Sequence, residues 1–353
     1  MKIGLKLTIL FFTIAFLSIS IIGYLAYDRA KVSLQEESFN RLTAVREMKA
    51  AQIEDYFQEI RDQVVTFSEN HSTILAMKAF KEGFATIQNE VNFGEEEDKE
   101  LKRYYQEQFL PALNPNLKKY AIVEDFWPNN DKTKLLQELY ISSNPNPAGS
   151  KHHLTSVKDT SAYSKAHEIY HPLMRNYLEK FGFYDVFLVD DQTGDIVYSV
   201  FKEVDYATSL LNGPFDNTNF SRTFRAAVGS DKKDFISIVD FEPYKASYNA
   251  HASFIASPIY DGNQRIGVLI FQMPIDGINS IMVNNQDWEK VGLGASGETY
   301  LVGADKKLRS ESRFLIEDKK NYIAALIESQ SQPNVQQISV NNSALGLQYV
   351  NTP

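Results

Sequence analysis

The sequence contains no cysteine among its 353 residues. Disulfide bonds, thiolate metal sites and cysteine nucleophiles are therefore excluded. It also lacks any run of lysine and arginine with interleaved aromatic residues, and its formal net charge at pH 7 is −9. Proteins that bind nucleic acid usually carry a basic face, so we expect no nucleic-acid partner. With 43% hydrophobic and 23% charged residues, the chain has the composition of a globular protein with two or three folding units.

Charged residues are also absent from the twenty residues Leu7–Ala26. A helix of this length spans about 30 Å, the thickness of the hydrocarbon core of a bilayer. A cleaved signal peptide is the competing interpretation, but its apolar region is normally about 7–15 residues long, and Tyr24-Leu25-Ala26 is a poor cleavage site. We therefore expect residues 1–27 to be a cytoplasmic tip and an uncleaved membrane anchor, with Lys2 and Lys6 on the cytoplasmic side. The rest of the chain would then be periplasmic or extracellular.

Proline and glycine are missing from the segment after the anchor, where the first Gly is Gly83 and the first Pro is Pro111. We expect residues 28–112 to form a long stalk helix and a following helix. A single helix from about Asp28 to Phe84 would be about 85 Å long; the alternative is two shorter helices broken near Glu69-Asn70-His71. Such a stalk pairs with a second copy of the chain or serves as a spine for later domains. Apolar residues in it alternate spacings of four and three, as on a helix that packs along another helix: Ile53, Phe57, Ile60, Val64 and Phe67.

Turn-forming residues dominate the first part of residues 113–182, which predicts a long structured loop up to Lys158. A helix is expected from about Ser161 to Phe181. It contains His167, Glu168 and His171 in the H-E-x-x-H pattern of zinc proteases, so a membrane-anchored metalloenzyme is the alternative function of a different class. However, Pro172 disfavours helical geometry at His171. We expect these histidines to pack or to form hydrogen bonds, and we expect no metal site and no catalytic residues.

From Phe183 onward the hydrophobic pattern changes to the period of strands, and residues 183–285 are expected to form a membrane-distal module. A strand at Asp185–Asp190, a tight turn ending at Gly194 and a strand at Asp195–Val200 predict a β-hairpin. After a helical stretch, three more strands are expected at Phe235–Phe241, His251–Ile259 and Arg265–Met273. This order predicts a five-stranded antiparallel sheet of the PAS type, which cups a small pocket.

Several motifs, spread from about Tyr140 to Phe314, resemble bacterial double Cache sensors of methyl-accepting chemotaxis receptors. They include Phe183–Asp190 (FYDVFLVD), Val200–Glu203 (VFKE), Gly213–Phe215 (GPF), Asp240–Tyr244 (DFEPY), Phe254–Pro258 (FIASP), Gly267–Gln272 (GVLIFQ) and Gly292–Val302 (GLGASGETYLV). The same sensors occur on histidine kinases and nucleotide cyclases. The resemblance implies paired PAS-like modules without cofactor or catalytic residues. The amino-acid-binding signature of some Cache sensors, a Tyr followed by Arg and then Trp-Tyr, is absent here, so no ligand is implied.

The alternation of strand residues nominates side chains for a ligand site. Ile236, Ile238 and Asp240 share one strand face, so an inward-facing Asp240 would meet either a ligand amine or a neighbouring Arg. The other candidates are Tyr163 and His167 from the preceding helix, with Tyr198, Tyr244 and Gln272 from the module itself.

Residues 286–353 are expected to form a membrane-proximal PAS-like module that is incomplete. Its first strand is predicted at Glu298–Val302, followed by a helix at Asn321–Ser329 and strands at Gln337–Val340 and Leu345–Val350. The spacing Gly292-x-Gly294-x-x-Gly297 matches a dinucleotide fingerprint in letters only, because it precedes a strand. Since a complete module and a returning membrane helix are both missing, we expect the 353 residues to be a fragment.

Together these features predict an α+β chain with a transmembrane helix, a stalk helix and two PAS-like modules. The predicted function is the ligand-sensing region of a bacterial transmembrane chemoreceptor, which binds a small molecule in its distal module. The sensor region of a histidine kinase or nucleotide cyclase is the alternative. Expected partners are a small-molecule ligand, the lipid bilayer of the inner membrane and a second copy of the chain, joined through the stalk as a homodimer. A purely structural coiled-coil protein would instead have no pocket.

Overall fold

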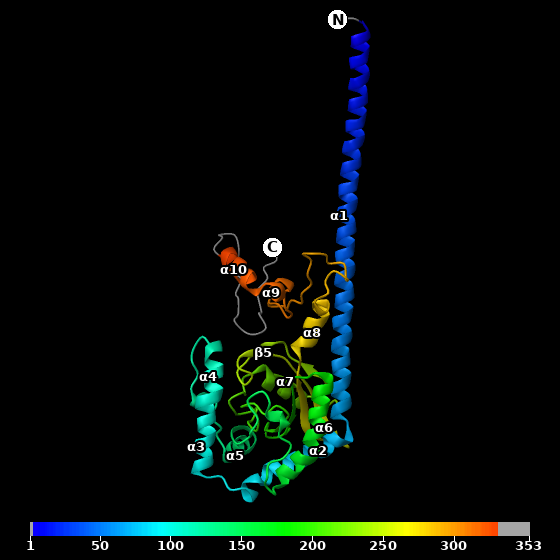
Figure 1. The fold of residues 1–353 in the computed structure, drawn as a ribbon. Coiled ribbons are helices and arrows are strands. Elements are labelled where there is room, and N and C mark those ends of the chain that lie inside the picture. The colour runs from blue at the N-terminus through cyan, green and yellow to red at the C-terminus, as the bar shows by residue number, and fades with distance from the viewer. Residues whose placement is uncertain (1–2, 331–353) are drawn as a thin grey trace.

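The computed structural model describes residues 3–330, which form one very long helix and an α+β body beside its lower half (Figure 1). Helix α1 (Ile3–Ser68) has 66 residues and is therefore about 100 Å long. By length and composition, its N-terminal part is the one helical segment among residues 3–330 that could cross a membrane. The hydroxyl groups of Thr8, Thr13 and Ser18 donate hydrogen bonds to backbone carbonyls one turn earlier in the helix, which satisfies these polar groups within the apolar stretch.

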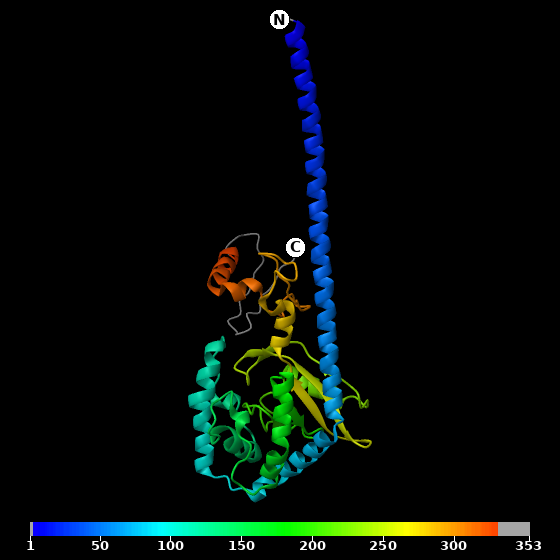
Figure 2. The same ribbon diagram turned by 45° about the vertical axis from the view of Figure 1, so that its right-hand side comes forward.

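The stalk helix ends at Ser68, so the expectation of one helix running to Phe84 is wrong and the alternative of two helices is correct. Asn70 adopts an extended backbone, and its side chain accepts a hydrogen bond from Ser72 N at 2.8 Å, which caps helix α2 (His71–Glu90). The chain turns sharply there, and α2 runs obliquely from the foot of the stalk across the lower end of the body (Figure 2). A helix cap, which the apolar pattern does not reveal, is thus the physical reason for the break.

Short helices surround the distal body. The expected loop between residues 113 and 158 contains helix α5 (Asp131–Gln137), and this part of the prediction is wrong. Asn130 was expected in a turn, but its side chain accepts a hydrogen bond from Thr133 N and caps α5. The expected helix near Ser161 is confirmed as α6 (Ala162–Phe181), which continues through Pro172. The remaining elements before the sheet are α3 (Glu95–Tyr104), the π-helix η1 (Tyr105–Phe109), α4 (Leu110–Leu113), the 3-10 helices η2 (Asn114–Asn116), η3 (Val123–Asp125) and η5 (Lys151–His153), and the π-helix η4 (Glu138–Ser142).

The predicted five-stranded antiparallel sheet is confirmed, with strand order β2-β1-β7-β6-β3. The hairpin turns through Gly194 and Gly262 have positive φ, which glycine adopts without steric cost. Strands β4 and β5 form a separate two-stranded ribbon that the sequence did not indicate. The strands are β1 (Asp185–Val189), β2 (Ile196–Ser199), β3 (Ser237–Ile238), β4 (Glu242–Tyr244), β5 (Ala250–Ala252), β6 (Phe254–Asp261) and β7 (Gln264–Gln272), and helix α7 spans Asn219–Val228.

The two faces of this sheet have different partners. On one face Phe271 contacts Phe67 of α1 at a ring separation of 5.9 Å, so the stalk packs directly on the sheet. On the other face Phe187 contacts Phe220 of α7 at 4.6 Å. Gly83 of α2 lets that helix approach α6 closely, because a Cβ there would lie 2.6 Å from the Cα of Tyr163. The sheet is therefore held between the stalk side and the α7 side.

The membrane-proximal part has fewer regular elements between residues 274 and 330. The prediction of a strand at Glu298–Val302 is wrong, because this segment forms only a single β-bridge, from Val302 to Leu308. No other segment of residues 3–330 pairs with it, which leaves it extended without a ladder. The expected helix near Asn321 is confirmed as part of α10, and the strands expected at Gln337–Val340 and Leu345–Val350 lie outside the described residues. The helices here are α8 (Ile275–Met282), the 3-10 helix η6 (Asn284–Gln286), α9 (Arg313–Glu317) and α10 (Lys319–Gln330).

Candidate ligand-binding site

The loop that follows β2 carries three ionisable residues into the interior of the distal module. Lys202 and Asp205 are fully buried, and Glu203 is partly buried between them. Both Lys202 and Ala207 have positive φ, at 58° and 66°. Neither is glycine, so the backbone is strained at both ends of this loop, and strain of this kind is concentrated at functional sites. We call residues 202–207 the acidic loop.

Asp185, the first residue of β1, fixes the start of the acidic loop. Its carboxylate accepts hydrogen bonds from the backbone N–H groups of Val200 and Phe201 at 2.9 and 3.0 Å and from the Ser199 hydroxyl at 3.1 Å. Burial and, to a smaller extent, the nearby Asp205 carboxylate raise the pKa of Asp185 to about 7, against these hydrogen bonds. Asp185 is thus a buried group that titrates near neutral pH.

Asp205 and Glu203 lie beside groups that come from β4 and from the segment after it. The Tyr244 hydroxyl donates to Asp205 Oδ2 at 2.6 Å, and the Ser247 hydroxyl donates to Glu203 Oε2 at 2.7 Å. Burial raises the pKa of Asp205 to about 6 and also raises the pKa of Glu203. Gln272 at the end of β7 donates to the Ser247 hydroxyl at 3.3 Å. Tyr244 and Asp205 thus form one hydrogen-bonded pair, and Gln272, Ser247 and Glu203 form a chain of two hydrogen bonds. We call these five side chains the buried polar cluster.

Two acceptor atoms of this cluster have no hydrogen-bond partner among residues 3–330. They are Oδ1 of Asp205 and Oε1 of Gln272, both buried. A buried polar atom without a partner costs roughly 1–3 kcal/mol, so such atoms call for a physical explanation. A ligand that donates hydrogen bonds would supply one.

Lys202 points to the opposite side of the acidic loop, into a group of tyrosine rings. Its Nζ lies 5.0 Å from the ring centre of Tyr198, 5.6 Å from that of Tyr140 and 5.7 Å from that of Tyr206. It donates to the Ser199 carbonyl at 2.8 Å. Burial lowers the pKa of Lys202 to about 7, against the favourable charge of Asp185. The aromatic rings partly compensate the lost hydration of its ammonium form.

Three of the six residues nominated from the sequence, Tyr163, His167 and Tyr198, lie together on this tyrosine side. The Tyr163 hydroxyl donates to the Val197 carbonyl at 2.7 Å. His167 Nδ1 is 2.7 Å from the Thr155 carbonyl, so it donates, while its Nε2 is buried without a partner among residues 3–330. Burial lowers the pKa of His167 well below its usual value, so the imidazole is neutral.

The H-E-x-x-H pattern does not form a metal-ligand pair, although helix α6 is unbroken there. His171 Nε2 is 2.7 Å from the His152 carbonyl and must donate, so its Nδ1 accepts from the Tyr198 hydroxyl, also at 2.7 Å. Both nitrogens of His171 are therefore occupied, and Glu168 is exposed on the outer face of the helix. The histidines pack and form hydrogen bonds, as expected. Pro172 disfavours helical geometry at His171, but α6 remains helical there and continues to Phe181.

The other three nominated residues are divided between two places. Tyr244 and Gln272 belong to the buried polar cluster described above. Asp240 lies outside it, beyond the end of β3, where Arg309 binds its carboxylate through two hydrogen bonds of 2.8 and 2.7 Å. The guanidinium lowers the pKa of Asp240. Of the two partners expected for Asp240, a ligand amine or a neighbouring Arg, the structure provides the Arg, and the pair links the distal module to the membrane-proximal part.

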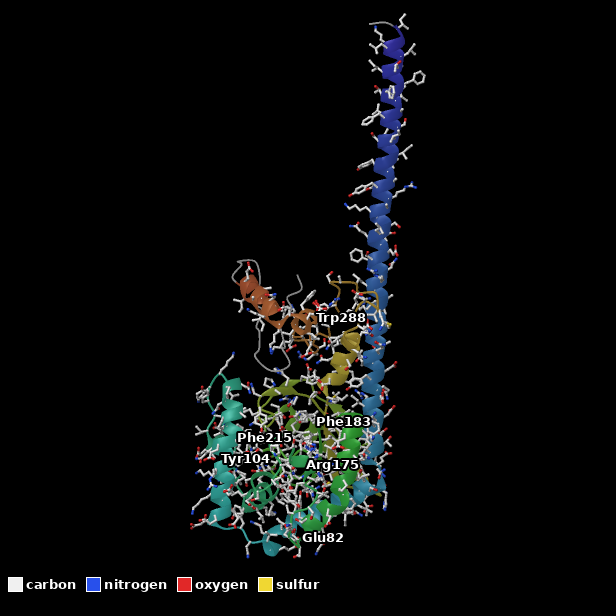
Figure 3. All side chains as sticks on the ribbon, in the orientation of Figure 1. Glu82, Tyr104, Arg175, Phe183, Phe215 and Trp288 are labelled. Carbon is white, nitrogen blue, oxygen red and sulfur yellow. The ribbon has the colours of Figure 1, made fainter. Side chains whose placement is uncertain are left out.

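Two cavities are lined by residues outside the buried polar cluster. One, of about 390 Å³, opens between Asn130 and the segment from Thr208 to Pro214, directly after the acidic loop. The other, of about 510 Å³, lies on the stalk between Lys49, Ile53 and the extended segment at Tyr300. The first borders the distal module, whose side chains are drawn in the lower part of Figure 3.

A signal for the acidic loop is present in the sequence. Lys202, Glu203 and Asp205 lie within four consecutive positions soon after the buried strand β2, and the VFKE motif was one of the motifs of the family resemblance. Charged residues cannot continue the buried face of a strand unless they are paired or bind something. Asp185, in contrast, looked like an ordinary strand-start residue, and its role depends on contacts across the hairpin.

Comparison with known proteins gives distant structural neighbours only. No protein-family model and no curated protein sequence matches the chain. Among solved structures, the sensor domain of the V. cholerae histidine kinase DctB is 16% identical with a TM-score of 0.26; the match covers 34% of this chain and 42% of that domain, less than half of its length. The ligand-binding domain of the Pseudomonas fluorescens chemoreceptor CtaA, in complex with L-serine, is 16% identical with a TM-score of 0.28, covering 69% of this chain and 87% of that one.

The ligand-binding domain of the Pseudomonas aeruginosa PAO1 amino-acid chemoreceptor PctC, in complex with GABA, is 13% identical with a TM-score of 0.26, covering 70% and 93% of the two chains. All three neighbours are sensor or ligand-binding domains.

Proposed function

We propose that this chain is the extracytoplasmic sensing region of a membrane-anchored bacterial receptor of the chemoreceptor type, and that its distal module binds a small molecule at the buried polar cluster. The observation that carries the proposal is the acidic loop, with its strained ends and the free acceptors Asp205 Oδ1 and Gln272 Oε1. The double Cache motifs of the sequence and the five-stranded sheet support it.

The chemistry of the cluster favours a ligand with a protonated amine. Both free atoms are acceptors, so the ligand must donate hydrogen bonds. Three carboxyl groups, Asp185, Glu203 and Asp205, lie close together. The Asp205 carboxylate raises the pKa of Asp185, and both raise the pKa of Glu203, so a positive charge among them would oppose this effect. Binding would therefore ionise the carboxyl groups and form charge-assisted hydrogen bonds, which are stronger than neutral ones.

The stalk offers a direct route from this module to the membrane. Ser68 at the end of α1 makes a buried hydrogen bond of 3.1 Å with Ser257 of β6, and Phe67 packs on Phe271 of β7. A ligand that prefers one arrangement of the sheet would therefore shift α1, and the shift would reach the anchor along a continuous helix. No chemical step is needed for this function.

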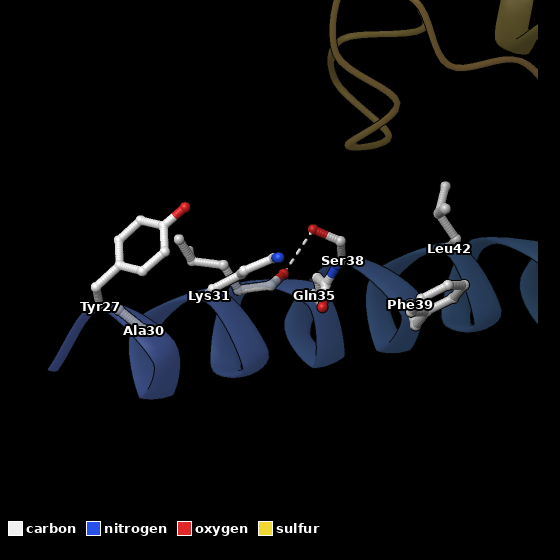
Figure 4. Close-up of a pocket in the computed structure, with 8 residues that line it drawn as sticks. Tyr27, Ala30, Lys31, Gln35, Ser38, Phe39 and Leu42 are labelled. Carbon is white, nitrogen blue, oxygen red and sulfur yellow. Dashed lines mark hydrogen bonds between the residues drawn. The ribbon is translucent and has the colours of Figure 1, made fainter. Parts of the chain in front are cut away.

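The upper stalk is the surface on which we place a second copy of the chain. Tyr27, Leu34, Phe39 and Leu42 lie along α1 between the anchor and the body, and 64% of Leu34 and 71% of Phe39 are exposed (Figure 4). The hollow between these side chains is formed by one helix alone, so it is a packing surface and not an enclosed pocket. A parallel second stalk would bury these side chains as in a two-helix coiled coil.

The test is ligand-dependent thermal unfolding of the full chain in detergent. Small primary amines, each paired with a neutral analogue of the same shape, are screened for a rise in the melting temperature. We expect some amines to raise it, and we expect Asp205→Asn to abolish the rise while Glu168→Gln, an exposed change on α6, retains it. A rise caused equally by the neutral analogues, or an undiminished rise in Asp205→Asn, would show that the cluster is not the binding site.

A further inference from the structure

Two adjacent histidines and a glutamate meet on the outer side of helix α6, away from the buried polar cluster. One ring nitrogen each of His152 and His153 and one carboxylate oxygen of Glu179 all lie within 4.8 Å of one another. His152 is buried, whereas His153 and Glu179 are exposed. Arg175, one turn before Glu179 on α6, marks this region in Figure 3.

The backbone that carries the two histidines is held in place from several directions. Asn144 donates to the Lys151 carbonyl at 3.0 Å, and the ammonium group of Lys151 donates to the Asn144 carbonyl, also at 3.0 Å. His171 donates to the His152 carbonyl at 2.7 Å. The ring of His152 stacks on Phe201 with a centroid separation of 4.4 Å. A ligand side chain fixed by such supporting contacts pays little entropy on binding an ion.

His152 differs from the two histidines of the H-E-x-x-H pattern, because it has binding capacity left. Its Nδ1 is buried and makes no hydrogen bond among residues 3–330. His171 bonds to the backbone carbonyl of His152 and to the Tyr198 hydroxyl, and neither hydrogen bond uses the His152 ring. A neutral imidazole with a free lone pair is the form that binds a metal ion.

We propose that His152, His153 and Glu179 bind a divalent transition-metal ion of the zinc class. Two imidazoles and one carboxylate form a donor set that suits Zn²⁺ and leaves a fourth position for water. At metal–ligand distances of about 2.0–2.2 Å the donor atoms must approach to roughly 3.3 Å of one another. The exposed side chains of His153 and Glu179 can close this gap, since neither is packed in the core.

Arg175 is a neighbouring cation that competes for Glu179. Its Nε lies 3.5 Å from Glu179 Oε1, beyond normal hydrogen-bond length, and the two side chains are 29% and 47% exposed. This long, partly exposed ion pair makes no hydrogen bond, so a metal ion that binds the Glu179 carboxylate directly can displace it. The site is independent of the proposed amine site: it uses none of the same side chains, and its ions would enter from solvent on the α6 side.

The experiment is calorimetric titration of Zn²⁺ into the full chain in detergent, with Mg²⁺ as a hard-ion control. We expect one saturable Zn²⁺ site and no heat of binding for Mg²⁺, which prefers oxygen ligands. His153→Ala and Glu179→Gln change exposed residues and should leave folding intact. Each should weaken Zn²⁺ binding by at least about 100-fold, since even loss of an outer-shell partner costs about 10–100-fold.

The matched controls are His71→Ala, an exposed histidine on α2, and Glu168→Gln, an exposed glutamate on α6. Both should bind Zn²⁺ like the unchanged chain. Absence of a saturable site, undiminished binding in His153→Ala or Glu179→Gln, or an equal loss in the two controls would each overturn the proposal. Because no amine is present in this titration, its failure would leave the proposed amine site untouched.

Discussion

Replacing Asp205 by asparagine should stabilise the folded chain at neutral pH and leave its stability near pH 4 unchanged. The carboxyl group is fully buried, and one of its oxygens has no partner among residues 3–330. Burial raises its pKa from 3.8 to about 6. Because one pKa unit corresponds to about 1.4 kcal/mol, ionisation of Asp205 costs the folded state roughly 3 kcal/mol more than the unfolded state.

The sign of the pH dependence follows from which state binds the proton more tightly. Between about pH 4 and pH 6 the folded state keeps the proton on Asp205 while the unfolded state has lost it, so the free energy of unfolding falls as the pH rises. Above pH 6 the full penalty is present. Asparagine cannot ionise, and its amide oxygen can still accept from the Tyr244 hydroxyl. The variant should therefore gain up to about 3 kcal/mol at pH 8 and nothing near pH 4.

The assay is thermal unfolding of the two chains at intervals from pH 4 to pH 8. A gain of about 3 kcal/mol corresponds to a rise of roughly 6–12 °C in melting temperature for a domain of this size. Removing the charge of Asp205 should also lower the pKa of Asp185, which adds to the gain near pH 7. Asp231→Asn, at an exposed position, is the control and should change nothing. If Asp205→Asn were less stable than the unchanged chain at pH 8, or equally stabilised at pH 4, the reasoning would be refuted.

Two further outcomes are expected. Gly83→Ala should destabilise the chain by about 1–3 kcal/mol in urea unfolding, because its Cβ would lie 2.6 Å from the Cα of Tyr163 and force α2 away from α6; an unchanged midpoint would contradict the close packing. Since the chain has no cysteine, Leu34→Cys provides a single thiol that should cross-link two stalks under mild oxidation, whereas Glu36→Cys, about 200° away around the helix, should not; equal cross-linking would argue against this stalk surface.

The order of elements in the distal module was accessible from the sequence because local signals and tertiary structure agree there. Gly194 and Gly262 mark tight turns between apolar strands, and both have the positive φ that such turns require. The errors occurred where one residue type serves two purposes. Asn70 and Asn130 are turn-formers by composition, but here each caps a helix. Composition alone cannot separate a turn from a helix cap, because the same side-chain hydrogen bond serves both.

The candidate site was only partly predictable for a different reason. Alternation along a strand places Tyr244 and Gln272 on an inner face, and both belong to the buried polar cluster. The same rule nominated Tyr198 and Asp240, but β3 is only two residues long, so alternation ends before Asp240. The position of α1 also decides which of the two sheet faces lines the pocket. A strand pattern contains no information on where α1 packs.

The position of Asp240 bears on how a signal would leave the distal module. Arg309 is only 7% exposed in its side chain and belongs to the membrane-proximal part, which itself touches the stalk where the Lys49 ammonium group donates to the Ile281 carbonyl. Two routes therefore connect the distal sheet to the stalk. One is the direct contact at Phe67, and the other runs from Asp240 through Arg309 and the membrane-proximal part. If the sheet moved relative to α1, the ion pair would have to break or carry the proximal part with it. Breaking the pair would remove two charge-assisted hydrogen bonds from the buried Arg309 and leave it with Asp305 as its carboxylate partner, so movement of the two parts together costs less free energy.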